Sequence, residues 1–257
     1  QEFRLDGNEV GYVFSAFALA QLACSPFVGI LATRFSRRFV TMAGFSCLVF
    51  CTYFFGQVSP NLDEACLIFF VLRMGQGMGG SLIMTCLNAA LADAFPESRG
   101  MVMGASELAT SFGWSGGPAI GGLLYSAGGF SLPFTVFSAL CLLSALPTMA
   151  LWASPALQPI TPSETSLKRR LSLSHVSGLM PVLFSQVALL TSWCAFDLGY
   201  TSWLHDRFGF GTVVSSLYFA IGPTVYMLVS FPVGWLCDRT TRRKLLMAAG
   251  MVGQGFS

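Results

Sequence analysis

Charge is scarce in this sequence. Asp, Glu, Lys and Arg make up 10% of its 257 residues, against roughly 25% in an ordinary soluble domain. No apolar stretch has the short core and small-residue cleavage site of a signal peptide. The eight cysteines form no CxxC pair and no loop cluster, which argues against a disulfide framework or a zinc site. A soluble enzyme or binding module is therefore disfavoured, and the 54% of hydrophobic residues call for lipid around the chain.

Long apolar runs take the place of charge. A run of about 20 residues crosses the hydrocarbon core of a membrane, which is roughly 30 Å thick. Seven runs reach this length and an eighth begins near residue 245. The seven lie at 10–32, 39–57, 65–92, 100–124, 131–152, 179–203 and 212–237. The sequence therefore predicts an all-α, polytopic membrane bundle, and we expect both ends to be cut, since Gln1 opens a polar stretch and Ser257 falls inside the last run.

Basic residues lie on alternate loops between these runs. Eleven of the fourteen fall in the first, third, fifth and seventh loops: Arg34, Arg37, Arg38, Arg99, Lys168, Arg169, Arg170, Arg239, Arg242, Arg243 and Lys244. The opposite side receives only Arg4 and Arg207. Because cytoplasmic loops carry an excess of Lys and Arg, the pattern predicts that the four basic loops are cytoplasmic. The segment 153–178, rich in Pro and Ser, is then a flexible cytoplasmic linker.

The chain contains an internal repeat. Residues 25–38 read SPFVGILATRFSRR and residues 230–243 read SFPVGWLCDRTTRR. Both segments end a predicted span on the cytoplasmic side, and five spans lie between, so the repeat offset is six spans. A parallel six-plus-six duplication resembles the major facilitator transporters, which bind substrate at the midplane between two halves. The resemblance implies a fragment covering about spans 2 to 9, with an N-terminal bundle at 1–152 (spans 2–6, span 1 missing), the linker at 153–178 and a C-terminal bundle at 179–257 (spans 7–8 and the start of 9).

The repeated segments are similar to the gating-loop signature of that superfamily. The matching residues are Gly29, Arg34, Arg37 and Arg38 in the first copy and Gly234, Asp238 and Arg239 in the second. The first copy has Thr33 at the acidic position and Ser36 at the second glycine, so it lacks the carboxylate of the superfamily's usual charge pair. A generic basic loop is the alternative, but it explains neither the glycine spacing nor the repetition. We expect Gly29 and Gly234 to allow close helix approach, with the charges holding one conformer.

The fourth predicted span of this chain carries a glycine and proline pattern. Gly113, Gly117, Pro118, Gly121 and Gly122 match the signature of proton-coupled antiporters in this superfamily at every fixed position. Pro118 removes a backbone donor and kinks the helix, while the glycines let another helix lie close. An ordinary small-residue packing face is the alternative reading.

The span at 65–92 resembles another superfamily signature, Arg-x-x-Gln-Gly, here Arg73, Gln76 and Gly77. Its glycines lack the preceding strand that a phosphate-binding loop needs, so a helical span explains them better. Arg73, Gly77, Ser81, Met84 and Asn88 recur at helical spacing on one small or polar face. We predict that this face lines the transport cavity, with Met84 and Asn88 facing substrate.

Three charged residues fall inside spans: Arg73, Glu107 and Asp197. Each costs at least about 2.5 kcal/mol in lipid, so each is a functional candidate that faces protein or water. Asp197 has Trp193 and Tyr200 on its own helix face, and an anion flanked by aromatics suits an organic cation. An interfacial aspartate is the alternative. Glu107 is a candidate proton acceptor because burial favours the neutral carboxyl, with a structural salt bridge as the rival role. We expect Arg73 to take part in proton coupling as well, although its depth in the membrane differs from that of Glu107 by some 7 or 8 Å.

The stretch from Asn88 to Tyr125 and the segment VSFPVGWLCDR narrow the resemblance. They look like the vesicular amine transporter family, solute carrier family 18, with its polyamine branch closest. The resemblance implies an antiporter that exchanges protons for an amine across the membrane of an acidic vesicle, with Asp197 at the seventh-span acidic position and Glu107 at an acidic position of the polyamine branch. In that family a proline usually follows the acidic residue of the seventh span, whereas here Leu198 follows Asp197.

Other functions stay open at this point. A multidrug or metabolite transporter of the same superfamily, in the plasma membrane or an organelle, fits the same motifs, and so does a truncated membrane protein that does not transport. His175 and His205 lie in or beside loops without a partner at a readable spacing, so we predict no enzymatic triad. The expected partners are membrane lipid, a small organic cation and protons. We expect no cofactor, metal or nucleic acid.

Overall fold

The computed structural model describes residues 7–59, 65–152, 207–209, 212–240 and 249–250. The predicted linker 153–178 and the predicted span 179–203 lie outside these residues. So do the predicted cation-site residues Asp197, Trp193 and Tyr200, which therefore stay predictions.

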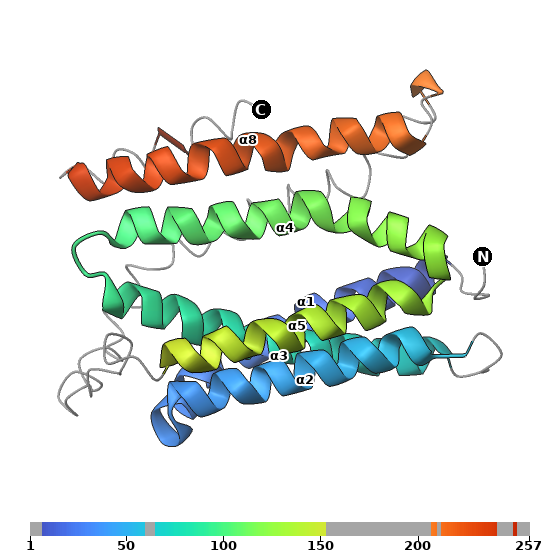
Figure 1. The fold of residues 1–257 in the computed structure, drawn as a ribbon, viewed down its shortest axis with the longest axis horizontal. Coiled ribbons are helices and arrows are strands. Elements are labelled where there is room, and N and C mark those ends of the chain that lie inside the picture. Colours follow the sequence, from blue (N-terminus) through green and yellow to red (C-terminus); the bar gives the residue numbers. More distant parts are fainter. Residues whose placement is uncertain (1–6, 60–64, 153–206, 210–211, 241–248, 251–257) are drawn as a thin grey trace. The chain divides into compact units, whose positions relative to one another are not determined.

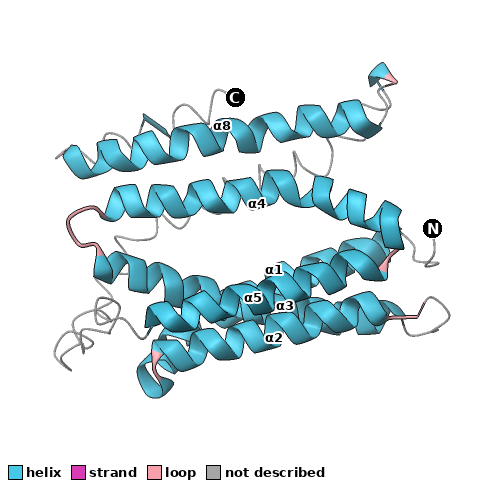
Figure 2. Cartoon of the chain, in the orientation of Figure 1, coloured by secondary structure: helices cyan, strands magenta, loops and turns pink. Residues whose placement is uncertain are grey.

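Every long predicted run within the described residues is a helix (Figure 1). The helices are α1 (Gly7–Phe35), α2 (Arg37–Gln57), α3 (Ala65–Ala94), α4 (Arg99–Gly128), α5 (Ser131–Trp152) and α8 (Thr212–Arg239). Their bounds lie within a few residues of the predicted spans. The regular structure of the described residues is helical throughout (Figure 2), which confirms the all-α prediction.

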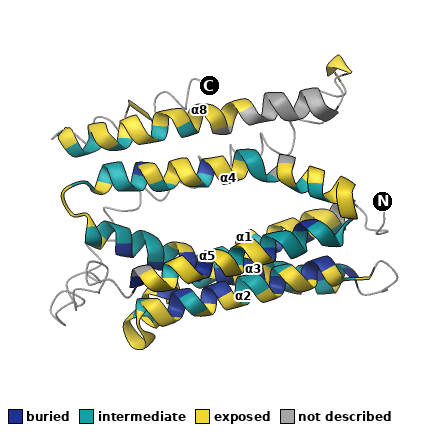
Figure 3. Cartoon of the chain, in the orientation of Figure 1, coloured by how far each residue is buried: buried dark blue, intermediate teal, exposed yellow. Residues whose placement is uncertain are grey.

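Four of the described helices are long and apolar enough to cross a membrane. These segments are Glu9–Phe35, Arg37–Gln57, Ala65–Ala94 and Ser131–Ala150. Large apolar side chains point outward from them, and Figure 3 shows exposed and buried positions alternating along α1 to α5. Leu22, for example, is 74% exposed. Such surface is unfavourable in water and natural in lipid, so the chain is a multi-pass membrane protein.

The chain forms two compact units, and one of the boundaries between them falls inside α4. One unit comprises Gln1–Phe95 and Pro118–Pro159, and the other comprises Pro96–Gly117 and Ile160–Ser257. The boundary between Gly117 and Pro118 lies within the predicted antiporter signature. The division into bundles at 1–152 and 179–257 with a linker between them remains a prediction.

In the first unit, α3 packs against α1 and α2, and α2 packs against α5. Glycines set how closely the helices approach. A Cβ at Gly44 of α2 would lie 2.9 Å from the Gly79 carbonyl oxygen of α3, and one at Gly77 would collide with the Phe17 carbonyl of α1. Small residues at these crossings let the backbones touch, as membrane helices require when lipid supplies no hydrophobic drive between them.

Polar contacts show which helix ends share a side. Arg37 at the start of α2 donates to Asp93 at the end of α3 over 2.7 Å. At the other ends, the Gln57 amide donates to the Ser131 hydroxyl of α5 over 2.9 Å. The first and third loops therefore lie on the same side of this unit, as the charge pattern predicts. Their cytoplasmic assignment remains a prediction.

Candidate functional site

In the second unit, α4 and α8 cross at small residues. A Cβ at Gly104 would lie 2.7 Å from the Ser230 carbonyl oxygen, and one at Gly234 would collide with the carbonyl of Gly100. The helices run in opposite directions, because Gly100 meets Gly234 while Gly104, four residues later, meets Ser230, four residues earlier. The predicted close approach at Gly234 is confirmed. The signal in the sequence was the spacing Gly-x-x-x-Gly on α4 and Ser-x-x-x-Gly on α8. The sequence analysis predicted the contact on α8 but not the one on α4.

Asp238 ties the end of α8 to the start of α4. Its two carboxylate oxygens accept hydrogen bonds from the backbone N–H groups of Gly100 and Met101, over 2.8 and 2.7 Å. These amides belong to the first turn of α4, where N–H groups lack partners within the helix and the helix dipole favours an anion. The Arg239 guanidinium stacks on Trp235 at 4.1 Å from the ring centroid. Asp238 is thus a charged cap supplied by another helix.

Glu107 lies on the face of α4 that meets α8. The Tyr226 hydroxyl of α8 donates to its Oε2 over 3.2 Å, and the Ser111 hydroxyl donates to its backbone carbonyl over 2.8 Å. In the described part of the chain no Lys or Arg pairs with this carboxylate. The rival role as half of a structural salt bridge therefore has no support there. The burial that we expected is also not found, because Glu107 is exposed among the described residues.

Arg73 lies in the other unit, within α3. Its guanidinium donates to the Gln76 side chain over 3.0 Å, and that amide donates to the Thr52 hydroxyl over 3.3 Å. The guanidinium carbon also lies 5.4 Å and 4.9 Å from the ring centroids of Phe14 and Phe55. Its Nε is buried without a partner, and among the described residues no carboxylate pairs with it. The aromatic faces compensate part of the desolvated charge.

The predicted cavity-lining face of α3 is divided. Gly77 packs against the Phe17 carbonyl, and the buried Ser81 lies 3.1 Å from the Ser25 hydroxyl oxygen, both on α1. This part of the face is therefore a helix contact and not a cavity wall. Met84 is 41% exposed and Asn88 is half-buried, so these two remain able to meet a ligand.

The first predicted gating loop is built differently from the expectation. No described residue comes within 4 Å of a Cβ placed at Gly29, so the predicted close approach at Gly29 is not found in the described part of the chain. Ser36 has φ 71°, a left-handed conformation that favours glycine, and its hydroxyl caps α2 by accepting from Phe39 N over 3.4 Å. This explains why the superfamily signature has a glycine there. Arg37 pairs with Asp93, while Arg34 and Arg38 are exposed.

The antiporter signature makes no close helix contact within the described residues. A Cβ at Gly113, Gly117 or Gly122 would meet no described atom within 4 Å, and one at Gly121 would lie 3.9 Å from the Phe137 ring. The expected close approach is therefore found elsewhere on α4, at Gly100 and Gly104. This finding does not change the sequence match to the antiporter signature, which includes Pro118.

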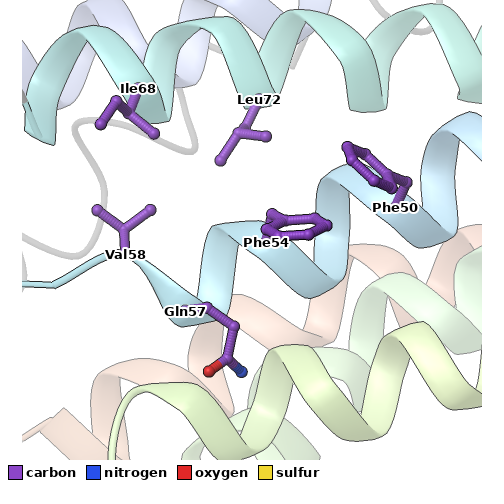
Figure 4. Close-up of a pocket in the computed structure, with 6 residues that line it drawn as sticks. All are labelled: Phe50, Phe54, Gln57, Val58, Ile68 and Leu72. Carbon is purple, nitrogen blue, oxygen red and sulfur yellow. The ribbon is translucent and has the colours of Figure 1, made fainter.

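A cavity of about 340 Å³ lies between α2 and α3 (Figure 4). Its lining is almost wholly apolar, and Gln57 points away from it toward α5. The lining residues are Phe50, Phe54, Gln57, Val58, Ile68 and Leu72. It includes none of the predicted site residues and offers no ion-binding group. Among the described residues no three His, Cys, Asp or Glu side chains come together as metal ligands would.

Comparison with known proteins decides the family. Residues 1–256 match the model of the Major Facilitator Superfamily. The chain belongs to the major facilitator superfamily. It is 28% identical to the MFS-type transporter SLC18B1 of Mus musculus, over 96% of this chain and 54% of that protein. It is also 28% identical to the human synaptic vesicular amine transporter, over 89% of this chain and 45% of that protein.

A bacterial relative is equally similar. The multidrug resistance protein 1 of Bacillus subtilis is 28% identical over 81% of this chain and 52% of that protein. The chain thus spans about half the length of the curated relatives it matches. No solved structure matches it. The predicted superfamily and the predicted likeness to the vesicular amine transporter family are confirmed.

Proposed function

We propose that the protein carrying this chain exchanges protons for an organic cation, an amine or polyamine, by alternating access. One observation carries the proposal: Glu107 lies in a helix that the sequence predicts to span the membrane, and its carboxylate has no cationic partner in the described residues. An unneutralised charge is costly in lipid, so it is retained where a ligand neutralises it in turn. A proton and an ammonium group are both ligands that a carboxylate without a cationic partner binds.

The relatives support this choice of ligand. One is named a synaptic vesicular amine transporter, and its match covers 89% of this chain. We place the cation at Asp197, flanked by Trp193 and Tyr200, because a carboxylate gives charge pairing and aromatic faces add cation–π attraction. Met84 and Asn88 are the proposed contacts from α3.

Proton coupling follows from differential affinity. A carboxylate that is ionised binds an ammonium group, and the same carboxylate when protonated does not, so proton uptake in one facing state releases the cation. We assign this exchange to Glu107 and Asp197, with Arg73 as a fixed positive charge that opposes a second cation nearby. An acidic vesicle lumen would supply the protons, and a vesicle membrane is therefore the proposed location.

The gating loops would hold one facing state. Asp238 on the first amides of α4 and the close crossing at Gly234 favour a closed contact between α4 and α8. To separate the helices at that end, the Asp238 hydrogen bonds and the packing at Gly234 must both be broken. Arg37 with Asp93 is the corresponding contact of the first loop, and the exposed Arg34, Arg38 and Arg239 complete the proposed gating set.

The test is uptake into proteoliposomes that hold the full-length protein. With an acid interior we expect uphill accumulation of radiolabelled spermine or serotonin. Glu107→Gln is expected to abolish accumulation but keep downhill exchange of labelled for unlabelled amine, since only proton coupling is lost. Asp197→Asn is expected to lose both. Normal accumulation by Asp197→Asn at equal expression would sink the proposed cation site.

A multidrug transporter is the second candidate, favoured by the bacterial relative named for multidrug resistance. The same proteoliposomes separate the two functions. Competition by ethidium and other bulky aromatic cations, with no competition by spermine or serotonin, would favour the multidrug function.

A further inference from the structure

We propose that Tyr226 makes the contact between α4 and α8 responsive to a proton. Its hydroxyl holds the two helices together while Glu107 is ionised, and the helices separate more readily once Glu107 is protonated. The inference rests on the proposed function, because it takes Glu107 as the group that exchanges the proton. It adds a positioning residue and a conformational response to that site.

The geometry places the pair at one end of a continuous contact. Asp238 binds the first amides of α4, and small residues bring the backbones together in the next turn. One further turn along, the Tyr226 hydroxyl lies 3.2 Å from Glu107 Oε2. In the described residues, Tyr226 is the only side chain bonded to the Glu107 carboxylate.

The chemistry of this bond depends on the proton. A hydroxyl that donates to an ionised carboxylate forms a bond roughly twice as strong as one between neutral groups. Protonation of Glu107 therefore weakens the link without removing any atom. The backbone crossing at Gly104 and Ser230 does not titrate, so a change in this contact with pH is not expected from packing alone.

Other ionisable groups lie at a distance along these helices. Besides the pair itself, those with described side chains are Arg99 and Tyr125 on α4 and Cys237, Asp238 and Arg239 on α8. Each is about two helical turns or more from Glu107 or Tyr226 along its own helix. Asp238 is bound by two amides and contacts the opposite end of the crossing. Glu107 and Tyr226 are thus the pair whose protonation acts on this part of the contact.

The experiment measures helix opening without transport. Hydrogen–deuterium exchange of the full-length protein in lipid nanodiscs, without substrate, is compared at pH 4.0 and 7.5, a range that spans the titration of an ordinary glutamic acid, after correction for chemical exchange. In the wild type we expect peptides covering 100–111 and 226–238 to be about tenfold better protected at pH 7.5, the factor expected for one charge-assisted hydrogen bond. Tyr226→Phe and Glu107→Gln are each expected to show equal protection at both pH values.

The control is Tyr125→Phe, because Tyr125 is another tyrosine of α4 with 45% exposure, close to the 46% of Tyr226. It should keep the wild-type response. A wild-type response in Tyr226→Phe, or in Glu107→Gln if the first variant fails to fold, would overturn the inference. Absent amine uptake would contradict the proposed function and leave this result standing. Proton-coupled uptake with no pH response in exchange would overturn only the role of Tyr226.

Discussion

The two predicted gating loops have similar sequences and are held by different chemistry. The first loop relies on an ion pair between the side chains of Arg37 and Asp93, which are 20% and 41% exposed. The second relies on Asp238, which binds the backbone at the start of α4. The first copy has Thr33 where the second has Asp238, so it has no carboxylate to offer a helix terminus. Duplicated segments can therefore keep their place in the fold and differ in strength.

Among changes to the two loops, removal of the Asp238 carboxylate should lower the stability of the protein most. Asp238→Ala deletes two hydrogen bonds to a charged acceptor and leaves two N–H groups of α4 without a partner, at a cost of about 3 kcal/mol. We expect a clear fall in the melting temperature of the purified protein. Asp93→Ala, the matched change in the first loop, should lower it much less. Equal losses would show that the two loops are equivalent.

Gly234→Ala should come next. Its new methyl group would collide with the Gly100 carbonyl, and overpacking a helix crossing costs about 1 to 3 kcal/mol. Gly29→Ala is the matched control in the first copy, where no described atom lies within 4 Å. Thermal unfolding in detergent checks both variants. A stable Gly234→Ala protein would contradict the close approach of α4 and α8.

Breaking the first-loop ion pair should have a small effect. Arg37→Gln removes a partly exposed pair, and such pairs contribute about 0.2 to 1 kcal/mol. The loss should shrink further in high salt, because salt screens exposed charges. Melting temperatures at low and high salt test this. For Asp238→Ala we expect the fall in melting temperature to persist in high salt, since part of it comes from unpaired backbone groups.

Ser36→Gly should change stability least. Glycine adopts φ 71° without strain, which favours the variant, but it removes the hydroxyl that caps α2. The two effects are each about 1 kcal/mol and oppose each other. We expect an unchanged melting temperature within error. Ser36→Ala, which loses the cap and keeps the strain, should be clearly less stable and serves as the comparison.

The sequence predicted the helices well because membrane spans are set by local composition. Apolar runs gave six helices within a few residues, and the basic loops gave the shared side of Arg37 and Asp93. The glycines that touch other helices were harder to predict. Gly113 and Gly122 match a signature and touch no described helix, whereas Gly100 and Gly104 do make the contact. Which glycine is used depends on how two distant helices cross, and one sequence does not contain that information.

The site residues show the same limit. Glu107 stands out from sequence because a charge in an apolar run is rare. Its partner Tyr226 does not, because the two are 119 residues apart and tyrosine is common in membrane helices. The split of the α3 face had the same cause. Helical spacing placed Gly77 and Ser81 together correctly, but it could not say that α1 covers them.

The small-residue crossing of α4 and α8 has a repeat of four residues on each helix. A sliding shift of one turn, about 5.4 Å, would bring Gly104 opposite Gly234 but would set Leu108 against Ser230, so only one contact between small residues would remain. The crossing itself therefore favours one register. The same shift would carry Asp238 off the first amides of α4 and Tyr226 off Glu107. The two polar contacts thus reinforce the alignment that the packing of small residues already selects.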